Sequence, residues 1–290
     1  MIMIKYVNGN TNVELFDDGT KIRTYAGNPA PEFPESIDVK ITDFCDQCCP
    51  YCHEQSDSMG NHGDLDRLFN VISELPAGVE MAIGGGNPLA HPNLVKLLIK
   101  LKDSGFISNI TVNQNHLYKD MKLIDNLINQ KLVYGIGVSI VNNNFGNIRF
   151  SDNMVFHLIA GISDIRIIDE LLKLSTKIPK ILVLGYKRFG RGSDYYNVSV
   201  EENINIWYRN ISRYIGKCIL CFDNLAIAQL NIRRLFTDRG WDLFYMGDDF
   251  QFSMYLDAVK GQYATSSRSS DRVNFDDCSL IEFFNGEHFL

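Results

Sequence analysis

Three cysteines with the spacing C-x3-C-x2-C are the residues of this chain most suited to chemistry. They lie in the segment KITDFCDQCCPYCHEQ, residues 40–55, and Tyr51 stands directly before the last of them; the three are Cys45, Cys49 and Cys52. Three thiolates on one short loop can bind three irons of a [4Fe–4S] cube, which leaves the fourth iron open to a second molecule. The segment therefore predicts a metal centre, with the cube as the first interpretation.

A zinc site is the alternative interpretation of the same segment. A closed zinc site requires four ligands, and either Cys48 or His53 could be the fourth. A disulfide framework is less suited to this chain, because its seven cysteines are odd in number and clustered. The first residues also lack the order of charge, apolar core and cleavage site that defines a signal peptide. We therefore expect a cytoplasmic protein in a reducing compartment.

The overall composition limits the classes of function. Hydrophobic residues make up 45% of the chain and charged residues 22%, which is typical of a soluble globular protein. A formal net charge of −7 argues against binding to a bare nucleic acid backbone, although it excludes neither a nucleotide substrate nor a local basic pocket. No apolar run reaches the roughly 18 residues of a membrane span, so we expect no membrane partner.

The elements that must position the cysteines alternate between strands and helices. Short apolar runs predict strands, and each is followed by a helical pattern or a short connecting segment, such as the one around 143–150. Repeated units of this kind imply parallel strands joined by right-handed crossovers, and functional loops at the carboxyl ends of those strands. The predicted strands are 36–42, 79–85, 107–114, 133–141, 154–161 and 180–187, and the helices are 64–75, 91–105, 117–130, 163–177 and 200–214.

Three parts of the chain follow from this pattern. Residues 1–34 predict a small β-hairpin or meander and a proline-rich linker, and residues 35–215 predict the βα core. Residues 216–290 predict an extension with further strands at 218–230 and 252–261, which completes the side of the barrel. A loop at 261–272 is expected to cover the substrate opening.

With the cysteine motif at the end of the first core strand, the chain resembles the radical S-adenosylmethionine enzymes over roughly residues 36–215. The resemblance implies an α/β fold, a partial (β/α)6 TIM-like barrel. It implies that Cys45, Cys49 and Cys52 ligate a [4Fe–4S] cluster whose open iron binds the amino and carboxylate groups of S-adenosylmethionine. Tyr51 would lie against the adenine, whereas Cys48 is not part of the motif.

Further positions match the family one by one. The turn AIGGGNPL resembles the family's G-G-E-P turn, which would bind the methionine amino group through its backbone; here Asn87 replaces the usual Glu. The resemblance assigns the ribose or methionine end of the cofactor to polar residues at the ends of the next two strands, and the adenine to apolar residues of the last two. The cofactor residues implied in this way are Gly84, Gly85, Gly86, Asn87, Asn113, Gln114, Ser139, Ile159, Leu184 and Arg191.

The segment GYKRFGRG resembles the family's recurring G-R-A/G motif. It brings Lys187, Arg188 and Arg191 to the open mouth, where their charges could hold a carboxylate or phosphate. Asp223 and Tyr255, with Asn224, Gln229 and Asp257 near them, are further candidate substrate contacts. Cys218, Cys221 and Cys278 would be the ligands of an auxiliary cluster, although Cys218 and Cys221 fit a buried strand better. No residue is assigned as a catalytic acid or radical quencher.

The resemblance also implies a mechanism. A reduced cluster passes one electron to S-adenosylmethionine, and the 5′-deoxyadenosyl radical then removes a hydrogen atom from the substrate; the protein positions the reactants and excludes water. We expect a small polar substrate such as an amino acid or nucleotide, and a one-electron donor such as flavodoxin or ferredoxin. The alternatives are modification of a macromolecule (a peptide or a hypermodified phage-type DNA base) and a non-enzymatic zinc- or cluster-binding protein.

Overall fold

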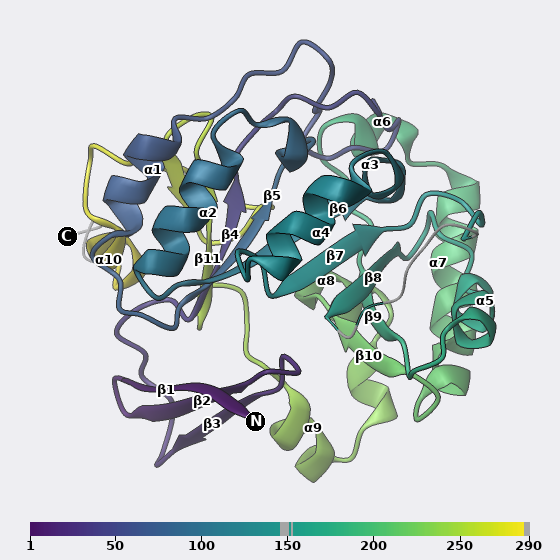
Figure 1. Cartoon of the computed structure of the whole chain (residues 1–290). Coiled ribbons are helices and arrows are strands. Elements are labelled where there is room, and N and C mark those ends of the chain that lie inside the picture. Colours follow the sequence, from purple (N-terminus) through teal and green to yellow (C-terminus); the bar gives the residue numbers. More distant parts are fainter. Residues whose placement is uncertain (146–150, 152, 287–290) are drawn as a thin grey trace.

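A curved sheet with the strand order β10-β9-β8-β7-β6-β5-β4-β11-β12-β13 forms the centre of the protein (Figure 1). The structure is a computed structural model, and it describes residues 1–145, 151 and 153–286. Strands β10 to β11 in this order are parallel, and β12 and β13 pair antiparallel at one edge. The strands are β4 (Ser36–Lys40), β5 (Glu80–Gly84), β6 (Ile107–Asn113), β7 (Gly135–Ser139), β8 (Met154–Ile159), β9 (Lys180–Leu184), β10 (Ile219–Phe222), β11 (Ser253–Asp257), β12 (Gln262–Ala264) and β13 (Val273–Asn274).

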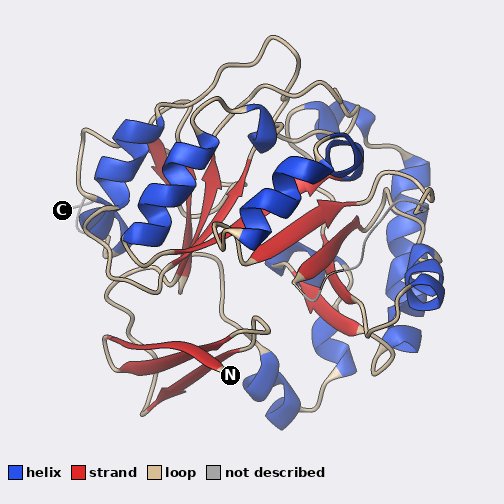
Figure 2. Cartoon of the chain, in the orientation of Figure 1, coloured by secondary structure: helices blue, strands red, loops and turns tan. Residues whose placement is uncertain are grey.

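Helices cover the convex side of the sheet, apart from α9 (Asp238–Phe244), which lies below it beside the small N-terminal sheet (Figure 1 and Figure 2). They are α1 (Leu65–Ile72), α2 (Leu94–Asp103), α3 (Gln114–Lys119), α4 (Met121–Asn129), α5 (Ile167–Leu174), α6 (Arg191–Tyr195), α7 (Val198–Asn210), α8 (Asn224–Gln229), α9 (Asp238–Phe244) and α10 (Leu280–Phe284). Short 3₁₀ turns lie at Pro88–Ala90, Ile211–Tyr214 and Ile232–Leu235. None of the described helices is long and apolar enough to cross a membrane.

The two faces of each strand differ in chemistry. On β4, Ile37 and Val39 are buried in the apolar core, so Asp38 and Lys40 face the concave side. Continuing the register places Ala82 and Gly84 of β5 on that same concave side. The concave side is the interior of the partial barrel, and on β4 it carries charged residues where the convex side carries the core.

A separate three-stranded antiparallel sheet, β1 (Ile2–Asn8), β2 (Thr11–Phe16) and β3 (Lys21–Tyr25), covers the amino ends of the barrel strands. Lys21 of β3 lies 2.6 Å from Glu80 at the start of β5, and Lys180 at the start of β9 donates to the Asp18 carbonyl at 2.6 Å. Arg23 of β3 also pairs with the fully buried Glu35 at 2.8 Å. The carboxyl ends of the strands, where the cysteine loop begins, lie at the other end of the barrel.

The predicted α/β barrel with a small N-terminal sheet is confirmed. Asp64 begins α1 as predicted, since its carboxylate accepts from the backbone N–H groups of Asp66 and Arg67. The strand predicted over 218–230 is wrong in its second half. It ends at Phe222, because Asp223 accepts from the N–H of Ala226 and begins helix α8. Of the connecting segment expected around 143–150, residues 146–150 lie outside the described part.

Candidate active site

The cysteine loop leaves the carboxyl end of β4 and returns at α1, so it lies at the mouth of the barrel. Its own backbone holds it in place. The Cys45 N–H donates to the Asp57 carbonyl at 2.7 Å, and the Cys52 N–H donates to the Cys49 carbonyl at 3.1 Å. These contacts fold the three motif cysteines into one compact turn.

The three motif thiols are close enough to affect one another. Burial raises the pKa of the Cys49 thiol, and the charges of Cys45 and Cys52 raise it further. A tetrahedral zinc ion with bonds of about 2.3 Å would bring its sulfurs to about 3.8 Å from each other. Yet no three cysteines in the described residues bring their sulfurs within 4.8 Å of one another. In the described chain the three motif sulfurs are therefore not gathered around a single tetrahedral ion.

Neither proposed fourth zinc ligand is free to join the three cysteines. Cys48 adopts a left-handed backbone with φ of 44°, and its exposed thiol donates to the Cys45 carbonyl at 3.6 Å. His53 directs Nε2 to the carboxylate of Glu54 at 3.3 Å and to Lys187 at 3.1 Å. The alternative of a closed zinc site has no support from this arrangement.

Arg191, at the start of α6, holds the cysteine loop from the other side of the mouth. Its guanidinium donates to the carbonyls of Cys49 at 3.0 Å and Ser56 at 2.7 Å, and its N–H donates to the Cys52 carbonyl at 3.2 Å. The resemblance implied cofactor contact for this residue. In the structure its donors are directed to the loop that carries the cysteines.

The glycine turn lies directly beside the start of the cysteine loop. A Cβ atom on Gly86 would lie 2.2 Å from the Phe44 carbonyl, and one on Gly85, whose φ is 114°, would lie 2.5 Å from the Thr42 carbonyl. Packing against the loop therefore requires both glycines. A Cβ on Gly84 would meet nothing within 4 Å, so this residue opens onto the interior. Asn87 is buried and accepts from the Leu89 N–H at 3.2 Å.

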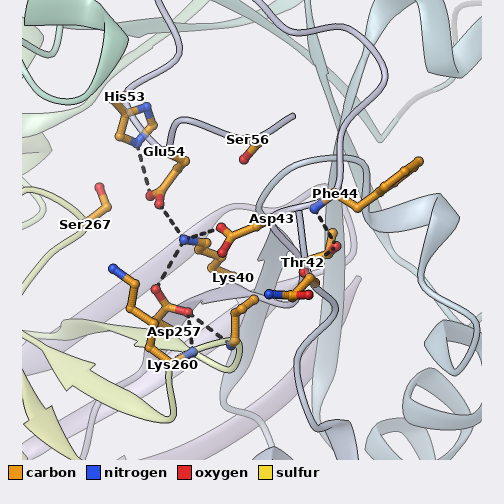
Figure 3. Close-up of polar contacts among 12 residues, drawn as sticks. Lys40, Thr42, Asp43, Phe44, His53, Glu54, Ser56, Asp257, Lys260 and Ser267 are labelled. Atoms are coloured by element: carbon orange, nitrogen blue, oxygen red, sulfur yellow. Dashed lines mark hydrogen bonds and ion pairs between the residues drawn. The ribbon is translucent and has the colours of Figure 1, made fainter. Parts of the chain in front are cut away.

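A buried lysine joins the two ends of the cysteine loop to the last parallel strand (Figure 3). The Lys40 ammonium lies 2.6 Å from Asp43, 3.0 Å from Glu54 and 3.2 Å from Asp257 of β11. The charge of Glu54 and the hydrogen bond to Asp43 raise the pKa of Lys40, although its burial acts in the opposite direction. Glu54 also accepts from the Tyr255 hydroxyl at 3.1 Å. The interaction of Asp257 with a lysine on β4 was not apparent from the sequence.

The predicted contacts at the ends of β6 and β7 divide into two groups. Asn113 and Ser139 are register partners on the interior face, and the Asn113 side chain begins α3 by accepting from the Asn115 N–H at 2.8 Å. Gln114 is fully buried; its amide donates to the Asn144 carbonyl and accepts from the N–H groups of Val141 and Asn142. Gln114 therefore holds the loop after β7.

The predicted adenine contacts lie on β8 and β9, one interior-facing register pair closer to the carboxyl ends of the strands than the pair of Ser139 and His157. Ile159 of β8 and Leu184 of β9 are register partners at the carboxyl ends of their strands, and both are half-buried on the interior face. Tyr51 packs edge-on against Tyr195 of α6, with ring centroids 5.8 Å apart. These apolar surfaces line the same end of the barrel as the cysteine loop.

His157 is an interior residue that sequence reasoning missed. It is the register partner of Ser139, and its ring lies over Gly137, where a Cβ would approach within 2.4 Å of the imidazole. Burial lowers the pKa of His157 to about 4, so the ring is neutral near pH 7. The signal was present in the sequence, since His157 is the polar residue in the alternating run MVFHLI.

The predicted substrate residues differ in their positions. The Lys187 ammonium contacts His53 at 3.1 Å and the Ser267 hydroxyl at 2.8 Å, whereas Arg188 is exposed and stacks on Tyr196 at 3.8 Å. Asp223 accepts from the N–H groups of Gly185 and Ala226. Gln229 exchanges two hydrogen bonds with the backbone of Tyr186, and Asn224 donates to Asp249.

The three remaining cysteines lie in different environments. Cys218 is buried, with its thiol 3.8 Å from the Tyr214 carbonyl. Cys221 is an exposed residue of β10 and the register partner of Leu182 on the interior face. Cys278 lies near the start of α10, where Glu282 and Asp277 raise its pKa together with burial. Within the described residues, these three do not form a ligand set.

One further contact joins the cysteine loop to α3. His116, which is fully buried, bonds through Nε2 to Asp46, and Lys119 lies 3.2 Å from the other oxygen of that carboxylate. Hydrogen bonds from these two side chains lower the pKa of Asp46 to about 2 against its partial burial. With Cys45, Asp46 and His116 are the one set of three possible ligand atoms within 4.8 Å of one another in the described chain.

Comparisons with known proteins find one matching family model and solved structures of similar fold. A family model described as the radical SAM superfamily matches residues 39–160. The fold is similar to that of Streptococcus suis SuiB bound to S-adenosylmethionine, with 13% identity, a TM-score of 0.56, and coverage of 89% of this chain and 68% of that one. SuiB bound to the precursor peptide SuiA gives 13% identity, a TM-score of 0.54, and coverage of 88% and 65%. The comparison with curated proteins found no match.

The chain spans about two thirds of the length of SuiB, and at this low identity the likeness establishes the fold alone. The family model is more informative, because the residues that it matches include the whole cysteine loop and the glycine turn beside it. On this basis residues 39–160 match the radical SAM superfamily, whose members are enzymes that use a [4Fe–4S] cluster and S-adenosylmethionine.

Proposed function

We propose that this enzyme cleaves S-adenosylmethionine at a cluster held by Cys45, Cys49 and Cys52 and modifies a small polar substrate inside the barrel. The observation that carries the proposal is the position of the three thiols at the mouth of a barrel interior that holds both charged and apolar side chains. When bound, the cluster and S-adenosylmethionine supply one-electron cleavage of a carbon–sulfur bond, and with it a radical that removes a hydrogen atom.

The residues of this chain would then bind and orient. The opening beside Gly84 supports a role for the glycine turn in holding the methionine end of S-adenosylmethionine, because a close approach there meets no side chain. Asn113 and Ser139 would bind the polar part of the cofactor from neighbouring strands. Tyr51, Ile159 and Leu184 would cover the adenine and exclude water from the reacting atoms.

The substrate would enter from the side of β9 and β10, where Lys187 and Asp223 lie. Arg188 is exposed at the same mouth and would contact an incoming substrate first. Nucleic acid is the weaker partner because the net charge is −7. Reduction requires a one-electron donor such as flavodoxin or ferredoxin, and the cytoplasm would provide one.

A peptide substrate is the second candidate. It is supported by the fold similarity to SuiB, a structure of which holds a precursor peptide. The chain spans about two thirds of that protein's length. A modified DNA base is a further macromolecular alternative, for which no observation speaks directly.

The experiment is anaerobic reconstitution with iron and sulfide, followed by dithionite and S-adenosylmethionine. We expect about four irons per chain and formation of 5′-deoxyadenosine. A single zinc per chain, or a Cys49→Ala variant that still forms 5′-deoxyadenosine, would contradict the proposal. Cys48→Ala is the matched control, because this cysteine lies on the same loop outside the motif, and it should retain the iron.

A further inference from the structure

An unpaired carboxylate faces the interior from the middle of β4. Asp38 is the register partner of Tyr255 on one side and Ala82 on the other, and its side chain is accessible from the interior. In the described part of the chain it has no hydrogen bond or ion pair. Loss of solvation inside the barrel raises the pKa of Asp38, and the positive charge of Lys187 opposes this rise. The Asp38 carboxylate is therefore open to the interior and free to pair with a ligand.

An ammonium group without a carboxylate partner lies in the same interior. Lys187 contacts only neutral groups at short range, the His53 imidazole and the Ser267 hydroxyl. Burial lowers the pKa of Lys187, whereas the charges of Asp223 and Asp38 oppose this. His53, which Lys187 contacts, lies beside Glu54, and Glu54 accepts from the hydroxyl of Tyr255, the register partner of Asp38. Lys187 and Asp38 therefore border the same part of the interior, yet none of the ion pairs within 4.0 Å among the described residues joins them.

Two unlike charges that face one space without meeting are complementary to a ligand that carries both. We infer that the substrate is a free amino acid, whose ammonium group pairs with Asp38 and whose carboxylate pairs with Lys187; this rests on the proposed function. Charge-assisted hydrogen bonds at both ends would fix its orientation as well as its affinity.

The nearby charges favour this class over a nucleotide. Asp223 acts on Lys187 from the end of β10, and within the described part of the chain its Oδ1 accepts two hydrogen bonds while its Oδ2 accepts none. Arg268 is already paired with Asp249. A phosphate beside Lys187 would bring about two negative charges and no cation to a space that holds the carboxylates of Asp38 and Asp223, whereas a free amino acid brings one negative charge together with an ammonium group that these carboxylates attract.

The test measures 5′-deoxyadenosine formation by the reconstituted enzyme with S-adenosylmethionine and dithionite. Each common free L-amino acid is added in turn. For any that stimulates, the N-acetyl derivative and the carboxamide are compared at equal concentration. We expect at least one amino acid to raise the rate about tenfold, and each derivative to lose most of that gain because one charge is removed. Stimulation by both derivatives as strong as by the free amino acid would overturn the inference.

Variants provide the second arm. Asp38→Asn and Lys187→Gln should each raise the half-saturating concentration of the stimulating amino acid by about tenfold or more. Asp103→Asn and Lys122→Gln remove the same charges from exposed positions on α2 and α4 and should leave it unchanged. If the half-saturating concentration of the amino acid is unchanged in both Asp38→Asn and Lys187→Gln, the inference is overturned. Should a variant fail to fold, the comparison of derivatives on the wild-type protein still decides.

The two hypotheses fail in different ways. Steady 5′-deoxyadenosine formation that no amino acid accelerates, or that only a peptide blocked at both termini accelerates, overturns the amino-acid assignment and leaves the proposed function intact. No 5′-deoxyadenosine under any condition, from protein with a full cluster, overturns the proposed function and the inference with it.

Discussion

The ammonium group of Lys40 lies 3.0 Å from Glu54, across the base of the cysteine loop. Asp43, on the other side of that base, lies 2.6 Å from the same nitrogen. Residues 43 and 54 enclose all three motif cysteines, so this one buried side chain fixes both ends of the metal-binding loop. The contact with Asp257 extends the support to β11, which is more than 200 residues away in the chain.

Replacing Lys40 with Met should therefore damage both stability and cluster loading. The change leaves three carboxylates without their shared cation, and loss of one partner from a buried ion pair costs about 3–5 kcal/mol. We expect a lower melting temperature and less iron per chain after reconstitution. Lys96→Met is the control, since its pair with Asp66 is exposed and contributes at most about 1 kcal/mol. Equal losses in the two variants would contradict the role of Lys40.

Much of the fold could be predicted because local patterns determine it. The alternating strands and helices follow from apolar periodicity, and Asp64 begins its helix through its own side chain. The second half of 218–230 could not be separated from a strand by apolar pattern alone. Only the hydrogen bonds of Asp223 to Ala226 and Gly185 identify the point where β10 ends.

The site was predictable where it depends on spacing within one loop, and not where it depends on distant segments. The motif Cys45, Cys49 and Cys52 is local, so the sequence alone identified it. Three other features depend on the register between strands: the contact of Lys40 with Asp257, the unpaired carboxylate of Asp38, and the position of the His157 ring over Gly137. A single sequence does not specify such register.

Two glycines of one turn should respond differently to the same substitution. In Gly86→Ala the new Cβ would collide with the Phe44 carbonyl at 2.2 Å, so the backbone must shift at a cost of about 1–3 kcal/mol. In Gly84→Ala the methyl group enters open space, so the melting temperature should stay close to that of the wild type. Its affinity for S-adenosylmethionine should fall about tenfold, as measured by calorimetry on the reconstituted protein. An unchanged affinity would remove the glycine turn from the cofactor site.

Arg191 should support the cluster without contacting the substrate. Arg191→Gln removes the donors to the carbonyls of Cys49 and Ser56, and lost hydrogen bonds from a charged group cost about 1.5–3 kcal/mol. We expect a cluster that is released faster under mild chelation, followed by its visible absorbance. Arg188→Gln is the neighbouring control, because this exposed arginine stacks on Tyr196 and, among the described residues, has no hydrogen bond to the loop. Identical release rates in these two variants would exclude the supporting role.

His157 should make the folded protein less stable in mild acid. Its pKa is about 4 in the folded barrel and about 6.5 in an unfolded chain, so the unfolded state binds the extra proton first as the pH falls. Stability is therefore lost between about pH 6.5 and pH 4, by up to about 3 kcal/mol for this group. His157→Gln removes the titration, so urea denaturation of the variant should have a shallower dependence on pH over that range. Because all carboxylates titrate in both proteins, the difference between the two curves isolates the histidine. Parallel curves would mean that the pKa of His157 in the folded barrel is not lower than its pKa in the unfolded chain.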